Sequence, residues 1–358
     1  MSPPMADTKG RRGRAFILVL LALIALGAAA GYVLLGEDFH SPGPAAKAIE
    51  LKVAPGESTR AVLARLAGLG ALDHPREVEL YLRLQRRIPR IEIGTYEVAP
   101  HASPADIIRM FEQGRVVLEQ ITIVEGARFA DFRHELDAQS DIAHTLRGRS
   151  ESEVMSALGH PGESPEGRFF PDTYRFTPGT SDETILSMAY ERMAAVLGRI
   201  WEQRSTDLPF DSPYQALILA SVIEKETGVT DERTRIAGVF VNRLRRGMRL
   251  QSDPTVIYGL GEQYDGKIHS RDLTTDTPYN SYTRSGLPPT PISLPGLESL
   301  LAAVHPDHTD DLYFVATGQG GHHFSKTLVE HDAELRAYLE RLREQQQAAV
   351  RRQPAGSR

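Results

Sequence analysis

The feature that most constrains this chain is an uninterrupted apolar run at residues 15–35. A run of this length is what a helix needs to cross a bilayer, so it cannot belong to an ordinary soluble domain surface. Ahead of it stands a basic cluster made of Lys9, Arg11, Arg12 and Arg14. Such a cluster favours a cytoplasmic N-terminus. We therefore expect everything after Gly36 to lie outside the cytoplasm.

A cleaved signal peptide is the alternative interpretation of this run. Ala28 and Ala30 resemble the small-residue pattern at which signal peptides are cut. The apolar run, however, continues past them through Tyr32 and Val33 to Leu35. This continuation favours an uncleaved single-pass anchor at residues 15–35, with residues 1–14 as a cytoplasmic tail.

The composition excludes several classes of protein and of functional site. The 358 residues are enough for two domains. Cysteine is absent, which excludes disulfides, a cysteine nucleophile, thiolate zinc sites and a lipoprotein anchor. The formal charge is −6, and it becomes more negative once the basic N-terminal cluster is set aside. The sequence thus argues against nucleic acid as a partner.

Beyond a short stem at residues 36–47, residues 48–115 have the pattern of a small α+β module. The expected elements are a strand at 49–53, a helix opened by Ser58, a helix from Pro75, a strand at 91–98 and a helix capped by Ser103. The order strand, helix, helix, strand resembles a LysM-like module, a type that binds glycan strands. A generic small α+β domain is the alternative.

Residues 116–344 are predicted to form a larger mixed α/β domain, so the expected fold class is α+β with an N-terminal transmembrane helix. We expect a strand at 116–124, helices at 127–158 (restarting near 150), 180–201, 212–227, 231–246 and 328–343, and a hairpin at 312–324. Residues 345–358 are polar and are predicted to be a disordered tail.

The helix at 212–227 carries the strongest chemical signal. Ser212 and Gln215 form a capping box, and Gly228 fits the residue after the C-terminus. The interior is apolar all round except for Ser221, which is typical of a core helix. Glu224 is the first charge after this stretch.

Burial and the negative end of the helix dipole would both raise the pKa of Glu224. A carboxyl that stays protonated near neutral pH is what a general acid requires. The alternative is that Glu224 swings into solvent and pairs with Lys225 or an arginine.

Three loops carry polar side chains suited to a binding cleft. Residues 249–259 hold Gln251 and Tyr258, which could contact a sugar, and Asp253, for which helix capping is the stronger interpretation. Residues 277–282 hold Asn280 and Tyr282, and the proline-rich residues 286–292 would form a stiff wall. Turn chemistry alone is the alternative explanation.

A metal site is not expected, although histidines gather near the C-terminal part. His322 and His323 would point to opposite faces of a strand, and no ligand spacing typical of a metal site occurs. The nucleophile-elbow motif G-x-S-x-G and the phosphate-binding motif G-x-x-x-x-G-K-[ST] are also absent from the sequence.

Taken together, these stretches resemble the MltG (YceG-like) family of endolytic murein transglycosylases. The resemblance rests on six strings in order, namely E-G-R-F-F-P-D-T-Y, A-S-V-I-E-K-E-T, V-F-V-N-R-L-R-R-G-M-R-L-Q-S-D-P-T-V-I-Y-G, P-Y-N-S-Y, G-L-P-P-T-P-I, and L-Y-F-V-A followed by G-G-H-H-F. Thr290 replaces a glycine common in the family's proline-rich wall, and His323 stands where a small polar residue is usual.

The resemblance implies a lyase of the bacterial inner membrane whose extracytoplasmic domain cleaves the β-1,4 bond between N-acetylmuramic acid (MurNAc) and N-acetylglucosamine (GlcNAc) within peptidoglycan strands. It carries the catalytic role to Glu224, which would act as acid and then as base while the muramic C6 hydroxyl forms a 1,6-anhydro end. No cofactor or metal is implied. The candidate substrate-binding residues are Glu166, Ser221, Gln251, Asp253, Tyr258, Asn280, Tyr282 and His322.

The family resemblance also implies partners, and it leaves two alternative functions open. Cutting near the membrane would end glycan synthesis beside a peptidoglycan synthase or divisome proteins. A muramidase that hydrolyses with water is one rival, for which Glu166, Asp253 and Glu226 are the candidate second carboxyls. Glu226 lies on a different helical face from Glu224 and is predicted to support it or face solvent. A non-catalytic peptidoglycan-binding division protein is the other rival.

Overall fold

Helix α1 (Thr8–His40) contains the apolar run that opens the chain. The computed structural model describes residues 8–54, 56–318 and 320–352, with side chains over 16–54, 56–318 and 320–344. Within α1, Phe16–His40 is long and apolar enough to cross a membrane, and none of its apolar window is buried by the protein. Residues 8–14 of the predicted tail continue this helix, while residues 1–7 lie outside the described part.

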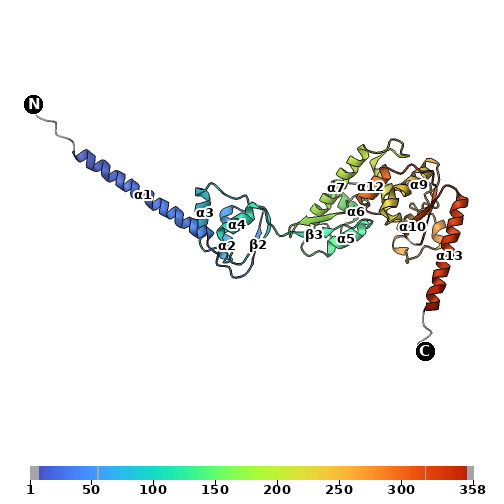
Figure 1. Ribbon diagram of the computed structural model, residues 1–358, viewed down its shortest axis with the longest axis horizontal. Coiled ribbons are helices and arrows are strands. Elements are labelled where there is room, and N and C mark those ends of the chain that lie inside the picture. The colour runs from blue at the N-terminus through green and yellow to red at the C-terminus, as the bar shows by residue number, and fades with distance from the viewer. Residues whose placement is uncertain (1–7, 55, 319, 353–358) are drawn as a thin grey trace, which may run out of the picture. The chain divides into compact units, whose positions relative to one another are not determined.

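The chain divides into two compact units, Met1–Glu119 and Gln120–Arg358. In the first unit the predicted order of elements is confirmed (Figure 1). The elements are β1 (Ile49–Val53), α2 (Thr59–Gly68), α3 (Pro75–Leu84), β2 (Gly94–Val98) and α4 (Pro104–Glu112). β1 and β2 pair antiparallel, with Leu51 opposite Tyr96. The serine cap predicted for α2 is present at Ser58, and α4 has a capping box formed by Ser103 and Asp106.

The second unit is mainly helical, with two small sheets. Its first part contains β3 (Glu119–Thr122), α5 (Phe129–Ala138), α6 (Glu151–Ala157), β4 (Thr173–Phe176) and α7 (Asp182–Glu202), with β3 paired to β4. Its second part contains α8 (Pro213–Glu226), η1 (Thr230–Glu232), α9 (Arg233–Arg245), α10 (Asp253–Leu260), η2 (Gly261–Gln263), α11 (Ser270–Thr274), α12 (Leu297–Val304), β5 (Tyr313–Ala316), β6 (His322–Ser325) and α13 (Leu328–Arg352). β5 and β6 form the predicted antiparallel hairpin.

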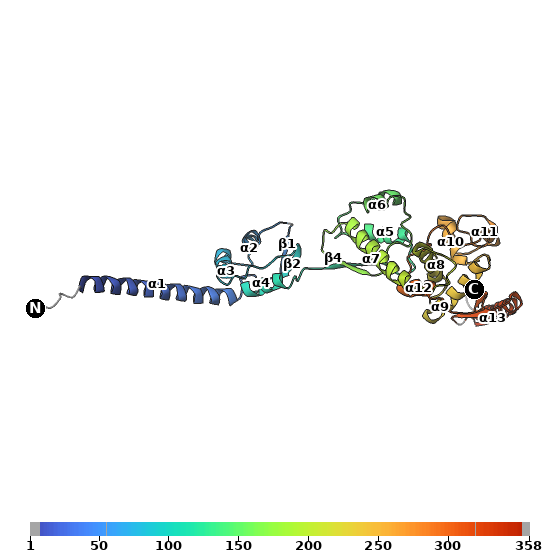
Figure 2. The ribbon, with the colours of Figure 1, turned by 90° about the horizontal axis from the view of Figure 1, so that it is seen from above.

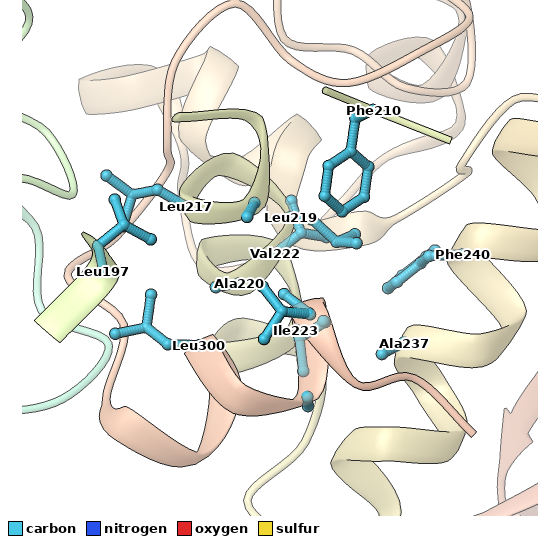
Figure 3. Packing of buried hydrophobic residues seen from close by; sticks show 14 of the residues in the cluster. Leu197, Phe210, Leu217, Leu219, Ala220, Val222, Ile223, Ala237, Phe240 and Leu300 are labelled. Atoms are coloured by element: carbon cyan, nitrogen blue, oxygen red, sulfur yellow. The ribbon is translucent and has the colours of Figure 1, made fainter. Parts of the chain in front are cut away.

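Helix α8 is the centre of the second unit's larger core. Every residue from 216 to 223 is buried, as its apolar composition predicts, and α7, α9 and α12 pack around it. Figure 3 shows Leu217, Leu219 and Val222 pointing into this cluster with Phe240 from α9 and Leu300 from α12. The Ser212 hydroxyl caps the helix, accepting from the Gln215 amide at 3.3 Å. The core thus fixes the position of the C-terminal turn of α8.

Several predicted element boundaries are wrong. The strands expected at 91–98 and 116–124 span only Gly94–Val98 and Glu119–Thr122, because their partner strands β1 and β4 are themselves short. Residues 139–150 are not helical, because the carboxylate of Asp182 accepts backbone hydrogen bonds from Thr145 and Leu146 and holds this segment as a loop. Helix α13 continues to Arg352 instead of ending near 343, in keeping with the strong helix formers Glu, Gln, Ala and Arg. Residues 353–358 of the predicted disordered tail lie outside the described part.

Candidate active site

The last turn of α8 presents two carboxyls, Glu224 and Glu226. Residues two positions apart on a helix are separated by about 200° around its axis, so the side chains of Glu224 and Glu226 point to different sides of α8. Thr227 then turns the backbone to an extended conformation and ends the helix. The two glutamates consequently meet different surroundings.

Glu224 lies in a nearly buried ion pair. Its Oε1 is 3.5 Å from Nη2 of Arg233, and its side chain is only 7% exposed. Its Oε2 accepts a hydrogen bond of 2.9 Å from the backbone amide of Gly296, at the start of α12. Both oxygens of the predicted acid therefore already have protein partners. The sequence alternative of an arginine partner is the one found, but it lies inside the protein and not in solvent.

Glu226 has the properties that the sequence assigned to Glu224. Burial of its carboxyl raises the pKa to about 7, opposed by the hydrogen bond that its Oε1 accepts from the Ser252 hydroxyl. The negative charge of Asp253 raises the pKa further, and the positive charge of Arg243 lowers it. A carboxyl with this pKa exchanges its proton near neutral pH, which suits a general acid.

Glu226 also lines a cavity of about 500 Å³ in the second unit. Strands β5 and β6 and helix α13 supply one side, and the loop before α10 supplies the other. The lining residues are Glu226, Arg243, Leu250, Gln251, Asp253, Tyr282, Tyr313, Phe314, Val315, Ala316, His322, Leu328, His331, Asp332 and Leu335. Apolar and aromatic walls with a few directed polar groups are typical of a ligand site.

Four of the predicted binding residues meet in this cavity. Gln251, which has a positive φ of 51°, accepts a hydrogen bond of 3.2 Å from Arg243. Tyr282 donates a hydrogen bond of 2.6 Å to Asp253. His322 places its Nδ1 2.7 Å from the carboxylate of Glu232.

The predicted cap is not seen at Asp253: Ser252 occupies the N-cap position of α10, and Asp253 is the first helical residue. The sequence reasoning therefore gave Asp253 the wrong local role, but it did place the residue among the candidate ligands of a glycan.

Arg243 is a cavity residue that the sequence reasoning missed. It is buried in α9, where Nε donates 2.6 Å to the carbonyl of Leu312 and Nη1 donates 2.7 Å to that of Leu250. These bonds hold the hairpin and the loop before α10 at a fixed spacing around Glu226. A buried charge on a core-facing helix position was the available signal.

Glu166 and Tyr258 lie together outside the cavity lining. The buried Glu166 carboxyl accepts 3.0 Å from the Phe129 amide and 3.1 Å from the Tyr258 hydroxyl. Burial raises the pKa of Glu166 to about 7. The ring of Tyr258 packs edge-on against Tyr279. The pair joins α5 to α10, which is a structural arrangement.

Ser221 and Asn280 are buried and fully used inside the protein. Ser221 donates 2.7 Å to the carbonyl of Ile218 and accepts 3.0 Å from the amide of Ile292, so it fastens the proline-rich wall to α8. The Asn280 side chain donates to the carbonyls of Asp272 and Thr275 and shapes its own loop. Neither side chain lines the cavity in this conformation.

One acidic cluster elsewhere has metal-like spacing, formed by Asp137, His144 and Asp182. Its Asp182 carboxylate already accepts hydrogen bonds from the backbone amides of Thr145, Leu146 and Glu183. The cluster is therefore explained by a structural role, because its Asp182 carboxylate holds the loop before α6.

The chain matches the model of the YceG-like family over residues 51–337. It belongs to the YceG-like family. The match covers both α8 carboxyls and the whole cavity lining, so the site described above is part of the family's domain.

Curated relatives bear the name endolytic murein transglycosylase. The one from Bacillus subtilis (strain 168) is 40% identical over 175 residues, covering 49% of this chain and 48% of the relative. The one from Streptococcus pneumoniae (serotype 2, strain D39) is 26% identical over 361 residues, covering 89% of this chain and 64% of the relative. The chain thus spans about half to two thirds of these relatives' lengths.

A solved structure has the same fold. The crystal structure of a putative yceG-like protein from Listeria monocytogenes aligns with a TM-score of 0.51 and 28% identity. The alignment covers 80% of this chain and 98% of the other. The mixed helix-and-sheet architecture is therefore that of the YceG-like family.

Proposed function

We propose that this protein is a membrane-anchored endolytic transglycosylase of peptidoglycan, which cleaves the β-1,4 bond between MurNAc and GlcNAc inside glycan strands. The observation that carries the proposal is the Glu226 carboxyl, with a pKa of about 7, at a cavity of about 500 Å³ whose apolar and aromatic walls carry a few polar groups. The relatives named endolytic murein transglycosylase supply the reaction class.

Within this proposal the general acid is Glu226, while Glu224 holds the site together. This reverses the roles expected from the sequence. Glu224 has Arg233 and the Gly296 amide on its two oxygens, whereas Glu226 faces the cavity and has the pKa that proton transfer needs. The sequence prediction of Glu224 stays a prediction until the variants below are measured.

One carboxyl can carry both halves of the reaction. Protonated Glu226 gives its proton to the glycosidic oxygen as the bond to C1 of muramic acid breaks. The resulting carboxylate then takes the proton of the C6 hydroxyl, whose oxygen attacks C1 and closes the 1,6-anhydro ring. Because this nucleophile is tethered to the sugar, the site has no need to capture water. Ser252 keeps the carboxyl oriented through both steps.

The matched variants Glu226→Gln and Glu224→Gln test the assignment on purified glycan strands with the full chain in detergent. Glu226→Gln keeps an oxygen for the Ser252 hydroxyl but has no acidic proton, so cleavage should fall about 10²–10⁴-fold. Glu224→Gln should still cleave. The opposite pattern would return the catalytic role to Glu224, and cleavage by both variants would remove the proposed mechanism.

A muramidase remains the nearest rival, because Asp253 lies close enough to Glu226 to raise its pKa and could activate water. Product mass separates the two reactions. Anhydro ends lack one water relative to reducing ends, so reducing ends alone would establish hydrolysis. A non-catalytic peptidoglycan-binding division protein would yield neither product.

The proposal includes an anchor at residues 15–35, with the N-terminus in the cytoplasm and both folded units outside it. Support comes from the apolar helix and the basic residues that precede it. A mature N-terminus near Gly31 in purified protein would contradict it. Held at the membrane, the enzyme would cut nascent strands next to a synthase and so end their growth.

We also propose that the first unit is a LysM-like glycan-binding module. Its β1, α2, α3, β2 order supports this, as does a cavity of about 710 Å³ between α2 and α3 lined by Arg60, Ala64, Pro75, Arg76, Glu79, Leu80 and Arg83. Deleting the module in a chain that keeps its anchor should weaken binding to peptidoglycan sacculi. Unchanged binding would contradict the assignment.

A further inference from the structure

Helix α3 packs along the outer end of α1, within the first unit. The Tyr81 ring lies 5.7 Å from that of Tyr32 and 4.7 Å from that of Phe39, centroid to centroid. Its hydroxyl is 3.3 Å from the point that a Cβ on Gly36 would occupy. Figure 2 shows α3 beside the last turns of α1. The aromatic contact therefore fixes the depth of α3 relative to the apolar helix.

The two helices run antiparallel. One turn before Tyr81, Val78 lines a cavity together with Asp38 and Ser41, which stand at and after the outer end of α1. Tyr81 itself reaches back to Tyr32. Moving along α3 toward its C-terminus thus means moving along α1 toward the bilayer.

The depth of the segment that follows can be estimated. Tyr81 contacts Tyr32 on one side and Phe39 on the other, and its hydroxyl lies against Gly36, so it stands at the end of the proposed span at Leu35. Leu84 stands three residues beyond Tyr81, which is ~5 Å in the direction of the bilayer at 1.5 Å per residue. Leu84 and the loop after it therefore reach the level of the lipid headgroups.

The chemistry of this segment suits that level. Leu84 is 55% exposed and Ile88 is 60% exposed. Residues 83–90 contain four arginines, Arg83, Arg86, Arg87 and Arg90, and no acidic residue. An apolar tip surrounded by arginines is typical of a segment that lies in a membrane interface.

Two acidic side chains of this unit are already held in ion pairs with arginines. Glu79 pairs with both Arg60 and Arg83, and Glu112 pairs with Arg87 at 2.5 Å. In the part of the chain that the structure describes, Arg86 and Arg90 form no ion pair. These two guanidinium groups are free for lipid phosphates, which they match in charge and geometry.

We propose that residues 83–90 form a second membrane contact, in which Leu84 and Ile88 enter the interface of the bilayer around the chain's own anchor and Arg86 and Arg90 bind lipid phosphates. The contact rests on the proposed anchor. It sets the orientation of the first unit on the membrane, because an anchor and a separate interfacial loop together stop the unit from tilting freely.

The absence of native cysteine makes a labelling test direct. Leu84→Cys and Ile88→Cys, each carrying a polarity-sensitive fluorophore, are compared in nanodiscs of mixed zwitterionic and anionic phospholipid. Leu69→Cys is the matched control, since Leu69 is 49% exposed in the same unit. Leu69 is the C-cap residue of α2 and lies two residues before Ala71, which is held against Gly43 beyond the end of α1. Leu23→Cys reports the anchor.

Spin-labelled lipids should quench the probes at 84 and 88 several-fold more than the probe at 69, with shallow labels more effective than deep ones. The probe at 23 should respond to deep labels. Probes at 84 and 88 that read as water-exposed, with 23 inside the bilayer, would overturn the inference and leave the anchor standing. A water-exposed probe at 23 would overturn both.

The arginines are tested separately with Arg86→Glu and Arg90→Glu combined. This change should reduce quenching at 88 in anionic nanodiscs and leave the unfolding midpoint unaltered. Arg76→Glu, at the other end of α3, is the control and should have no effect. Unchanged quenching in the double variant would overturn the assignment of these arginines to phosphate.

Discussion

Arg233 Nη2 lies 3.5 Å from Glu224 Oε1, and the two side chains are only 10% and 7% exposed. The same guanidinium donates 3.1 Å to the Ser299 hydroxyl and 3.2 Å to that of Thr230. Glu224 in turn accepts from the Gly296 amide. The pair and its hydrogen-bond partners thus connect the ends of α8, η1, α9 and α12, and α8 alone did not reveal these contacts.

Glu224→Gln should lower the free energy of unfolding by about 3 kcal/mol, because the nearly buried Arg233 would lose its ion-pair partner. Urea denaturation at neutral pH measures the loss. Glu298→Gln is the control, since it removes a charge at an exposed position of the same region and should change stability by less than about 0.5 kcal/mol. Equal effects of the two variants would show that the pair contributes little.

The pH dependence of cleavage should follow Glu226. Its pKa is raised to about 7, so the proton that the acid must donate is present below that pH and lost above it. We expect kcat/KM to fall tenfold per pH unit on the alkaline side of about 7. A profile with no alkaline decline between pH 6 and 9 would contradict the assignment of Glu226 as the acid.

Substitutions of two neighbours of Glu226 should shift the alkaline limb of the pH–rate profile in opposite directions. Asp253→Asn removes a negative charge that raises the pKa of Glu226, so the limb should move to lower pH. Ser252→Ala removes a hydrogen bond that lowers the pKa, so the limb should move to higher pH. Shifts on the order of half a pH unit are expected. Shifts of the same sign would mean that a group other than Glu226 limits the reaction.

Local patterns predicted most of the helices and both the capping box and the core character of α8, because these depend on residues within a few positions of each other. The choice between Glu224 and Glu226 depends on distant partners. Arg233 comes from the next helix, while Ser252 and the hairpin that borders the cavity come from later segments. Helical periodicity shows that the two carboxyls diverge but not which one meets a cavity.

The dependence on distant partners also explains why only some of the predicted loop residues line the cavity. Gln251, Asp253, Tyr282 and His322 line one cavity, as loop chemistry suggested. Asn280 has the same composition signal, but its amide is consumed by backbone carbonyls in its own loop. The same hydrogen-bonding residue types line cavities and stabilise loops internally, so only the three-dimensional contacts distinguish a binding residue from a loop-stabilising one.

The buried carboxyl of Glu166 should make stability depend on pH. Its folded pKa of about 7 lies above the ordinary 4.5, so its favourable contribution is full below pH 4.5 and is lost as pH rises through 7. Glu166→Gln can still bond Phe129 and Tyr258 but does not ionise. Relative to wild type, the variant should gain about 2 kcal/mol of unfolding free energy between pH 5 and 8. A constant difference between the two proteins would contradict the raised pKa.

Gly167→Ala should be among the most damaging small changes, because Gly167 brings the loop after Glu166 against the proline-rich wall. A Cβ there would lie 2.5 Å from the ring of Pro291, which is too rigid to move aside, at a φ of +80°. Gly162→Ala is the matched control, with a φ of +83° and no atom within 4 Å. The control should cost about 1 kcal/mol for backbone strain alone, and Gly167→Ala about 3 kcal/mol or more once overpacking is added. Equal losses of unfolding free energy in urea denaturation would mean that the proline-rich wall shifts to accommodate the added Cβ and does not hold the site in place.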